Sequence, residues 1–369
     1  MSNRVRNPPP GLSPLVELLR CIECGAPVKI KEIAAGPGYQ ELGPDGWLEC
    51  TSCGERYPVI GGTPRMLDRT ARAELRASYP ATAIELPPPG AEAVKNGSSS
   101  IMQRTADSFA YEWRHFGRPR AEWQQNFVGY MRPHGPGFFR DKLVLDVGTG
   151  SGRHSAQAAA LNARVVAVDL GRSVDVARRN LPHEVLTVQA DAERLPFAPG
   201  VFDFVMSIGV LHHLPDTERA FRSLVPVVAP GGRLHIYVYW VPERAFHRHL
   251  LRLVAAIRPV TTRLPYRVLH PLCYPLAAFL WLSVVAPYRA LRNRPRGRRV
   301  AEALPLKTYA DYPFGVLVND QFDRFSAPIE HRYTRSEVES MLKEAGLTEV
   351  TVIPNAGWIG DGRVPGINH

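Results

Sequence analysis

Apolar and polar positions alternate along the middle of the chain in the way typical of an α/β protein. Short apolar runs bounded by polar or glycine-containing turns predict five strands, at 143–147, 165–168, 185–188, 202–207 and 233–239. Segments with apolar residues three or four apart predict helices between them, such as Thr217–Val228. Strands that alternate with helices usually form one parallel sheet, so a doubly wound core is expected over residues 104–240.

The same pattern resumes near the C-terminus. A capping box at 334–337 and an amphipathic helix over 338–345 precede two further strands, one at 347–353 and one that begins around Trp358. Residues 306–369 are therefore expected to complete the sheet of the core.

An insertion, residues 241–305, separates these two parts and follows a different pattern. Residues 247–257 place apolar side chains at helical spacing, with arginines on the other face. Residues 272–288 carry no charge, but Pro275 and Pro287 are expected to interrupt them. The run also falls short of the roughly 20 residues that span a bilayer. The sequence therefore predicts a helical lid.

This insertion also holds the positive charge of the chain. The formal net charge is +10, whereas residues 241–300 contain 12 arginines and one acidic residue, Glu243. An apolar helix beside a basic cluster suits contact with an anionic membrane surface through residues 272–299, and RNA is a less favoured partner. A buried lid helix followed by a solvated loop explains the same pattern.

The turn after the first core strand carries the main candidate chemistry. An acidic residue precedes alternating glycines there, in the order Asp146, Gly148, Thr149, Gly150 and Gly152. Such a turn lets a ligand approach the backbone, and the following helix presents free N–H groups. The next strand ends at Asp169-Leu170, where a carboxylate can accept hydrogen bonds from ribose hydroxyls. A dinucleotide fingerprint needs glycine at position 153, which is arginine, so a dehydrogenase fits poorly.

The acidic residue with its alternating glycines resembles the first motif of class I S-adenosylmethionine-dependent methyltransferases, and later motifs follow in order to about residue 240. The resemblance implies a seven-stranded, mostly parallel, Rossmann-like sheet with S-adenosylmethionine at the carboxyl ends of the strands. It also implies that Asp191-Ala192 face the adenine. Ser207, at the end of the fourth strand, and Tyr111, in an aromatic segment before the core, are further candidate cofactor contacts.

Two histidines after the fourth strand, His212 and His213, are the candidate catalytic residues. The resemblance places their loop near the sulfonium, and imidazole titrates in a range that suits a general base. A structural role for the pair is the alternative. Trp113, His331 and Tyr333 are candidate substrate contacts, although a packed helix and a polar turn are simpler interpretations of their segments.

Two CxxC pairs near the N-terminus predict a metal site. Cys21, Cys24, Cys50 and Cys53 can supply four thiolates, a closed set that favours structural zinc, with an iron–sulfur cluster or free thiols as alternatives. Residues 15–67 resemble the zinc-ribbon family that activates methyltransferases as a separate subunit. The Ala-, Pro-, Gly- and Ser-rich residues 68–103 are expected to be a linker.

The sequence as a whole predicts a methyltransferase that acts on oxygen or nitrogen of a small acceptor of lipophilic or natural-product type. An RNA base methyltransferase with an RNA-binding zinc ribbon is an alternative, but Ser207-Ile-Gly-Val stands where such enzymes usually have an Asn/Asp-Pro-Pro motif. A protein that binds S-adenosylmethionine without methyl transfer is another. Residues 1–10 lack the apolar region of a signal peptide and the paired cysteines suit a reducing compartment, so a cytoplasmic location, with or without peripheral membrane contact, is expected.

Overall fold

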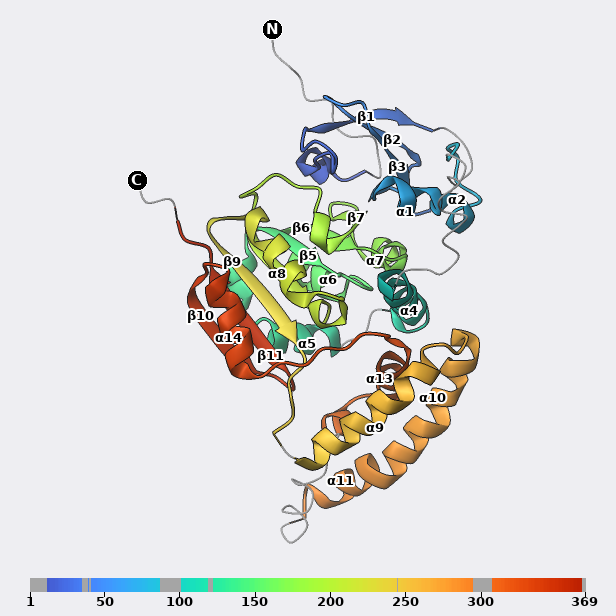
Figure 1. Ribbon diagram of the computed structural model, residues 1–369, viewed down its shortest axis with the longest axis vertical. Coiled ribbons are helices and arrows are strands. Elements are labelled where there is room, and N and C mark those ends of the chain that lie inside the picture. Colours follow the sequence, from blue (N-terminus) through green and yellow to red (C-terminus); the bar gives the residue numbers. More distant parts are fainter. Residues whose placement is uncertain are drawn as a thin grey trace.

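One mixed β-sheet forms the centre of the computed structural model (Figure 1). The structure describes residues 12–34, 39, 41–86, 101–118, 122–243, 245–294 and 307–366. The sheet has 11 strands in the order β1-β2-β3-β4-β7-β6-β5-β8-β9-β11-β10. The core strands are β5 (Leu143–Val147), β6 (Arg164–Asp169), β7 (Leu186–Ala190), β8 (Phe202–Ile208), β9 (Val228–Val238), β10 (Thr348–Pro354) and β11 (Trp358–Arg363).

The core strands are arranged as the sequence predicts for a doubly wound sheet. β5 to β9 run parallel, and β11 lies antiparallel between β9 and β10. Helices cover both faces, so β5 and β7 are buried along their whole length. These helices are α5 (Glu122–Tyr130), α6 (Arg153–Ala160) and α7 (Ser173–Asn180) on one face, and α8 (Thr217–Leu224) and α14 (Arg335–Glu344) on the other.

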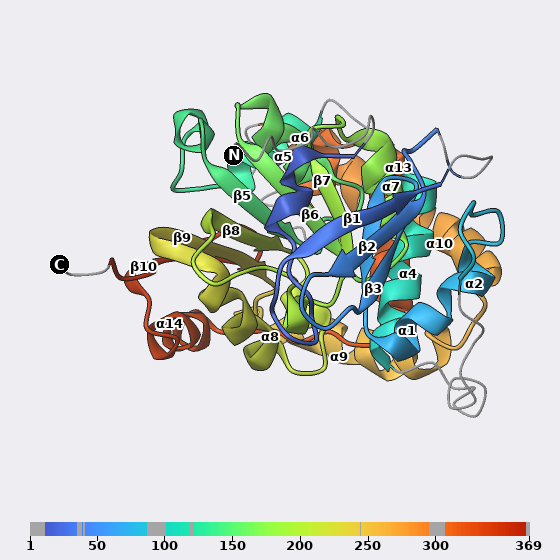
Figure 2. The ribbon, with the colours of Figure 1, turned by 90° about the horizontal axis from the view of Figure 1, so that it is seen from above.

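The sheet is larger than the expected seven strands because the N-terminal module joins it. β1 (Val28–Ile33), β2 (Gly46–Cys50), β3 (Arg56–Ile60) and β4 (Thr63–Met66) form an antiparallel meander. β4 then pairs in parallel with β7, and the backbone groups of β7 that face away from β6 thereby find partners. The module lies at the end of the molecule nearest the viewer in Figure 2.

Buried polar contacts connect this module to the core. The hydroxyls of Thr63 and Thr187 are 2.8 Å apart. The guanidinium of Arg65, only 1% exposed, lies 2.8 Å from the carboxylate of Asp175 on α7 and stacks over the ring of Tyr79. The Tyr79 hydroxyl donates to the same carboxylate. Each buried charge therefore has a partner, which burial requires.

The segment expected to be a linker, 68–103, is folded where the structure describes it up to residue 86. α1 (Arg69–Ala73) starts at the N-cap Asp68, and α2 (Leu75–Ser78) follows. The linker prediction is wrong there because four apolar side chains pack onto the module. They are Leu75, Tyr79, Ile84 and Leu86. Residues 87–100 lie outside the described residues, and α4 (Ile101–Phe116) begins at residue 101.

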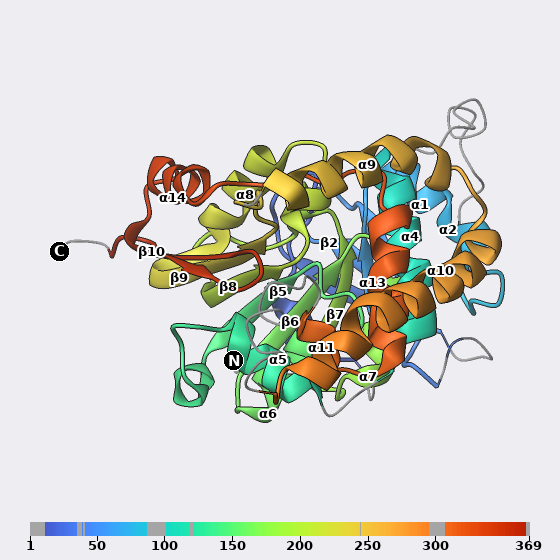
Figure 3. The same cartoon turned by 90° about the horizontal axis from the view of Figure 1, so that it is seen from below.

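The insertion is helical, as predicted, and lies beyond the carboxyl ends of the core strands (Figure 3). It contains α9 (Ala245–Thr261), α10 (Tyr266–Leu280), the π-helical segment Trp281–Val285 and α11 (Ala286–Leu291). α13 (Phe314–Ser326) follows and packs against α4, α9 and α10. Residues 295–306 lie outside the described residues. The remaining short helical segments are Pro14–Leu18, Pro136–Phe139, Ala192–Arg194, Leu211–His213, Val225–Val227 and Lys307–Asp311.

The prolines do not interrupt the apolar run as the sequence suggested. Helical backbone continues over Tyr266–Leu291, with Pro275 inside α10. The wider π-helical segment immediately before α11 accommodates Pro287, whose ring would otherwise clash with the carbonyl four residues earlier. An 18-residue window of this 26-residue run has a mean hydropathy of 1.7, so the run is long and apolar enough by composition to cross a bilayer, contrary to the prediction.

Arg65→Met tests the buried connection between the module and the core. Because the variant removes the buried cation of the Asp175 carboxylate and leaves only Arg172, 3.7 Å away, the free energy of unfolding at pH 7 should fall by about 3 kcal/mol. Burial opposes ionisation of Asp175, but Arg65 and Tyr79 outweigh it and lower its pKa. The contribution is therefore complete above the unfolded-state pKa of about 3.9 and is lost as the pH falls through the folded-state pKa.

Urea unfolding over a pH series measures this effect. Arg69→Met is the matched control, because exposed Arg69 pairs with Glu55 at the surface, and it should leave stability nearly unchanged. Equal losses in the two variants, or a loss in Arg65→Met that does not diminish in acid, would contradict the assignment.

Candidate functional site

The parallel core strands end along one edge of the sheet, and the predicted cofactor residues follow these ends. In Figure 1 the arrow of β9 points toward α9 and α13, so this edge faces the insertion. The glycine turn follows β5, Asp169 ends β6, Asp191 follows β7, and the histidine pair follows β8. Ligands of open α/β sheets bind at this edge.

Only glycine fits at two positions of the glycine turn. Gly148 and Gly150 have φ angles of +79° and +56°, which L-residues rarely adopt. A Cβ atom at Gly150 would lie 2.6 Å from the indole nitrogen of Trp113, and one at Gly148 would collide with Val210. Neighbouring side chains therefore pack directly against the backbone of the turn at both glycines.

Asp146 holds the glycine turn in place through hydrogen bonds. Its side chain is buried and accepts hydrogen bonds from the hydroxyls of Thr149, at 3.0 Å, and Ser155, at 2.6 Å. Burial raises the pKa of Asp146 to about 6, although both hydroxyls oppose the shift. Asp146 therefore supports the turn and does not face a ligand.

Asp169 joins the glycine turn to α7. Its carboxylate accepts from the Gly150 N–H at 3.0 Å, the Gly171 N–H at 2.9 Å and the Ser173 hydroxyl at 2.6 Å. The side chain is half-buried, and burial raises its pKa. These contacts hold the carboxylate at the edge where ribose was predicted to bind, and that role stays a prediction.

The other predicted cofactor residues lie along the same edge in different settings. Asp191 caps the short helix Ala192–Arg194 and accepts from the Glu193 N–H. Ser207 is buried, and its hydroxyl donates to the carbonyl of Val147 between neighbouring strands. Leu170 accepts a hydrogen bond through its carbonyl from Gln189. The hydroxyl of Ser207 is thus engaged in a hydrogen bond within the sheet.

α4 crosses this edge, and its two predicted aromatic contacts lie on different sides of the helix. Trp113 covers the glycine turn, with the guanidinium of Arg153 5.2 Å from its ring centre. Tyr111 packs instead against Tyr266 and Phe322 of the insertion and α13. Residues two apart on a helix point about 200° apart, so both cannot face the turn. Tyr111 therefore does not lie at the glycine turn, and Trp113 is the aromatic residue of α4 found there.

The histidine pair is buried beneath α4. His213 donates from Nδ1 to the carbonyl of Ile329 at 2.7 Å and meets the ring of Phe109 at 5.0 Å, which leaves Nε2 for another partner. The ring of His212 packs at a tilt against that of Tyr239, with 4.0 Å between ring centroids, and neither of its ring nitrogens has a partner among the described residues. Burial lowers the pKa of His212 well below its usual value, so its imidazole is neutral.

The predicted substrate contacts in the segment before α14 do not lie in this cluster. His331 is exposed, and only its backbone N–H reaches the loop, donating to the His212 carbonyl. Tyr333 is half-buried and packs against the sheet face that α8 and α14 cover. Its backbone pairs with that of Tyr239, which fixes its side chain toward that face.

The sequence analysis missed an acidic cluster between α4 and α13. The Asn319 amide donates to Glu112 at 2.9 Å, and the Tyr239 hydroxyl donates to Asp323 at 3.1 Å. Among the described residues, one oxygen each of Glu112, Asn319 and Asp323 is buried without a donor. Burial raises the pKa of Glu112 well above its usual value, and the charges of Asp323 and Asp320 add to the shift.

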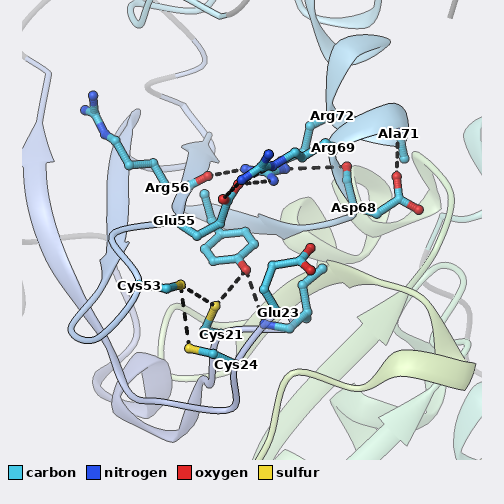
Figure 4. Close-up of polar contacts among 12 residues, drawn as sticks. Cys21, Glu23, Cys24, Cys53, Glu55, Arg56, Asp68, Arg69, Ala71 and Arg72 are labelled. Carbon is cyan, nitrogen blue, oxygen red and sulfur yellow. Dashed lines mark hydrogen bonds and ion pairs between the residues drawn. The ribbon is translucent and has the colours of Figure 1, made fainter. Parts of the chain in front are cut away.

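The four cysteines of the N-terminal module converge on one point. Figure 4 shows three of them, Cys21, Cys24 and Cys53. The sulfur atoms of Cys21 and Cys53, and of Cys24 and Cys53, are 3.6 Å apart, and those of Cys24 and Cys50 are 3.4 Å apart. Tetrahedral zinc with Zn–S bonds of 2.3 Å separates its sulfur ligands by about 3.8 Å. The four thiols therefore fit such an ion closely, and none of them forms a disulfide.

In a second group of possible metal ligands, the side chains already bond to one another. His134, His235 and Arg233 all contact the carboxylate of Asp361. The second ring nitrogen of His235 bonds to the carbonyl of Tyr130. Because a guanidinium already neutralises the carboxylate, this group is a structural network that joins β9 to β11.

Residues 145–236, from β5 to β9, match a family model described as a methyltransferase domain. These residues form a methyltransferase domain. The prediction of an S-adenosylmethionine-dependent methyltransferase is confirmed at the level of this domain. The glycine turn, Asp169 and the histidine pair all lie within it.

The methyltransferase domain has relatives with different acceptors. It is 36% identical over 125 residues to the chloroplastic tocopherol O-methyltransferase of Arabidopsis thaliana, covering 32% of this chain and 34% of the relative. It is 38% identical over 112 residues to the probable tRNA methyltransferase 9B of Mus musculus, covering 29% and 23%. Alignments to the curated relatives span 19% to 54% of their lengths.

A solved structure is similar to this chain over most of its length. It is a chain from the complex between the Trm112 methyltransferase activator of Haloferax volcanii and a methyltransferase. It is 16% identical, covers 72% of this chain and 99% of that chain, and has a TM-score of 0.42.

Gly150→Ala tests the glycine turn. The added methyl group would collide with Trp113 and strain a left-handed backbone, so affinity for S-adenosylmethionine should fall at least about tenfold in calorimetric titration. Gly129→Ala on α5 is the matched control, since a Cβ there meets nothing within 4 Å. Equal affinity in the two variants would remove the turn from the cofactor site.

Proposed function

We propose that this protein transfers the methyl group of S-adenosylmethionine to oxygen or nitrogen of a small acceptor bound between α4, α13 and the carboxyl ends of the core strands. The unpartnered oxygens of Glu112, Asn319 and Asp323 carry the proposal, because buried acceptor atoms require donors. An acceptor with O–H or N–H groups supplies such donors beside the methyltransferase domain.

The helices over the site favour a small acceptor. Trp113 lies on the glycine turn, and Phe109 lies on His213, so α4 closes the edge from above. Tyr111 in turn packs between α10 and α13. A base within RNA would have to be extruded and pass this cover, whereas a small molecule needs only a local opening.

Methyl transfer needs alignment and, for most acceptors, removal of one proton. The acceptor lone pair forms a bond to the methyl carbon while the C–S bond breaks, and its electrons stay on sulfur. Glu112 is suited to take the acceptor proton, because its raised pKa brings a carboxylate closer to neutral pH. His213 Nε2, beneath Phe109, is the second candidate base.

The cofactor is proposed to lie along the glycine turn, with Asp169 at the ribose and Asp191 near the adenine. Gly150 lets the indole of Trp113 approach the backbone of the turn closely, and Trp113 offers an aromatic face, which attracts a sulfonium cation. Cys21, Cys24, Cys50 and Cys53 are proposed to hold a structural zinc ion, supported by the spacing of their sulfur atoms.

An RNA substrate is the second candidate, and we place either reaction in the cytoplasm. The similarity to a probable tRNA methyltransferase and the exposed arginines of α9 favour RNA. The similarity to a tocopherol O-methyltransferase favours a lipophilic small molecule. The packing of α4 over the acidic cluster favours the small molecule, which we therefore propose as the acceptor.

An isotope-transfer assay separates these candidates. The purified protein is incubated with methyl-labelled S-adenosylmethionine and either total RNA or an extract of small molecules and lipids from the host. Label in the organic extract is expected, and the mass shift identifies the acceptor. Label in RNA would replace the proposal by the second candidate, and label in neither would favour a cofactor-binding protein that does not transfer.

Glu112→Gln and His213→Ala together identify the base. Glu112→Gln keeps the shape but removes the proton acceptor, so turnover should fall about a hundredfold or more with cofactor affinity nearly unchanged. In the unmodified protein the rate should rise with pH as the Glu112 carboxylate ionises, above the usual range for glutamate, and this rise should vanish in the variant.

If His213 is the base, His213→Ala shows the same large loss while Glu112→Gln retains turnover. Glu339→Gln, on the surface of α14, is the matched control and should keep the full rate. Normal turnover in both site variants would exclude a general base from this cluster.

Cys24→Ser tests the zinc proposal. Native mass spectrometry of the full chain should detect one zinc ion, and the variant should lose it because three thiolates bind zinc much more weakly. Cys273→Ala, in α10, is the control and should retain the ion. Iron with visible absorbance, or no metal in the unmodified chain, would contradict a zinc site.

A further inference from the structure

α9 presents a row of apolar side chains to solvent. Leu250, Leu253, Ile257 and Val260 are 43%, 62%, 50% and 63% exposed. Their spacing of three, four and three residues puts them on one face of the helix. Only Val254 of α9 is buried among the side chains that the structure describes. A face of this kind on a folded protein usually marks an interaction site.

The next helical run repeats this arrangement. Val268, Leu272, Phe279 and Leu282 are 44%, 54%, 66% and 66% exposed and follow one face. The opposite face of α10 is buried with α13 through Leu269, Cys273 and Ala277. α10 is therefore fixed to the protein along one side and bare along the other, although nothing in its position requires apolar residues on the bare side.

Unpaired positive charges accompany these apolar faces. Arg252, Arg263, Arg267 and Arg294 are exposed and have no acidic partner in the described part of the chain. Arg258 and Arg292 differ, because they pair with Glu330 and Asp311. The sequence has no acidic residue from 244 to 300, so the surrounding potential is positive.

We propose that α9 and the helical run Tyr266–Leu291 form a docking surface for an anionic lipid bilayer. Leucine and phenylalanine side chains more than half exposed suit the acyl boundary, and unpaired arginines suit lipid phosphates. Since α10 is held to α13 by its buried face, the run lies in the membrane interface and does not cross the bilayer. RNA would use the arginines but would have no use for the apolar rows.

A hollow on this surface extends the proposal toward the site. Ala278, Trp281, Leu282 and Phe314 give it an apolar lining, and Arg289 is its cationic member. Tyr312 also lines it, and Tyr309, three residues earlier, donates to Asp320 next to the acidic cluster. A lipophilic acceptor could pass from the bilayer through this hollow. This route rests on the proposed function, whereas the docking itself does not.

Vesicle flotation with the full chain tests the docking without cofactor or turnover. The unmodified protein should bind vesicles of phosphatidylcholine and phosphatidylglycerol at least tenfold more tightly than vesicles of phosphatidylcholine alone. Leu253→Ser with Phe279→Ser removes one apolar side chain from each row, and affinity should fall at least tenfold. Arg263→Gln with Arg267→Gln should weaken binding and reduce its dependence on salt.

Val128→Ser is the matched control for the apolar pair, because Val128 is 51% exposed on α5 and belongs to neither apolar row. It should bind like the unmodified protein. Arg335→Gln, exposed on α14, is the control for the arginine pair.

Three outcomes would overturn the docking surface. Equal binding to neutral and anionic vesicles, or none to either, would exclude an anionic bilayer. Binding to tRNA that the apolar pair leaves unchanged, without vesicle binding, would assign the arginines to RNA. A dimer in light scattering that the apolar pair dissociates, again without vesicle binding, would assign the rows to a second copy. Methyl transfer in extracts is measured separately, so either proposal can fail alone.

Discussion

A guanidinium buried between two parts of the chain makes this protein one folded unit. Arg65 contacts Asp175, the Ile60 carbonyl and Gln189 while only 1% exposed, and such a charge is tolerated only when it is paired with an opposite charge and hydrogen-bonded. Gln189 in turn donates to the carbonyl of Leu170, directly after Asp169. The cysteine module is thereby connected, through the side chains of Arg65 and Gln189, to the edge where the cofactor is proposed to bind.

The proposed site combines residues from opposite ends of the methyltransferase domain. The glycine turn and histidine pair lie within the domain, whereas Glu112 precedes it and Asp323 follows the insertion. α4 and α13 pack on each other across the ends of the strands and bring these two carboxylates together. The insertion is therefore part of the site's architecture, since α10 is the helix that supports α13 on its outer side.

Local patterns in the sequence predicted the core well. The strands and the capping box of Thr334 and Glu337 depend on neighbouring residues, and the structure contains them. The features that the sequence did not predict depend on distant partners. β4 joins the sheet only because β7 has an unpaired side. Tyr111 and Trp113 can be assigned to different sides of α4 only when the phase of the helix is known. Asp323 could be recognised as a site residue only once α13 was seen to pack against α4.

The position of the cysteine module also governs how the sheet meets other molecules. Without β4, the buried strand β7 would end the sheet with a free row of backbone groups on an apolar strand, a template for intermolecular pairing and aggregation. With the module in place, the outermost strand is β1, which exposes Lys29, Lys31 and Glu32 and carries a bulge. Charge and irregular register both discourage pairing with another chain, so the module protects the solubility of the enzyme domain as well as its fold.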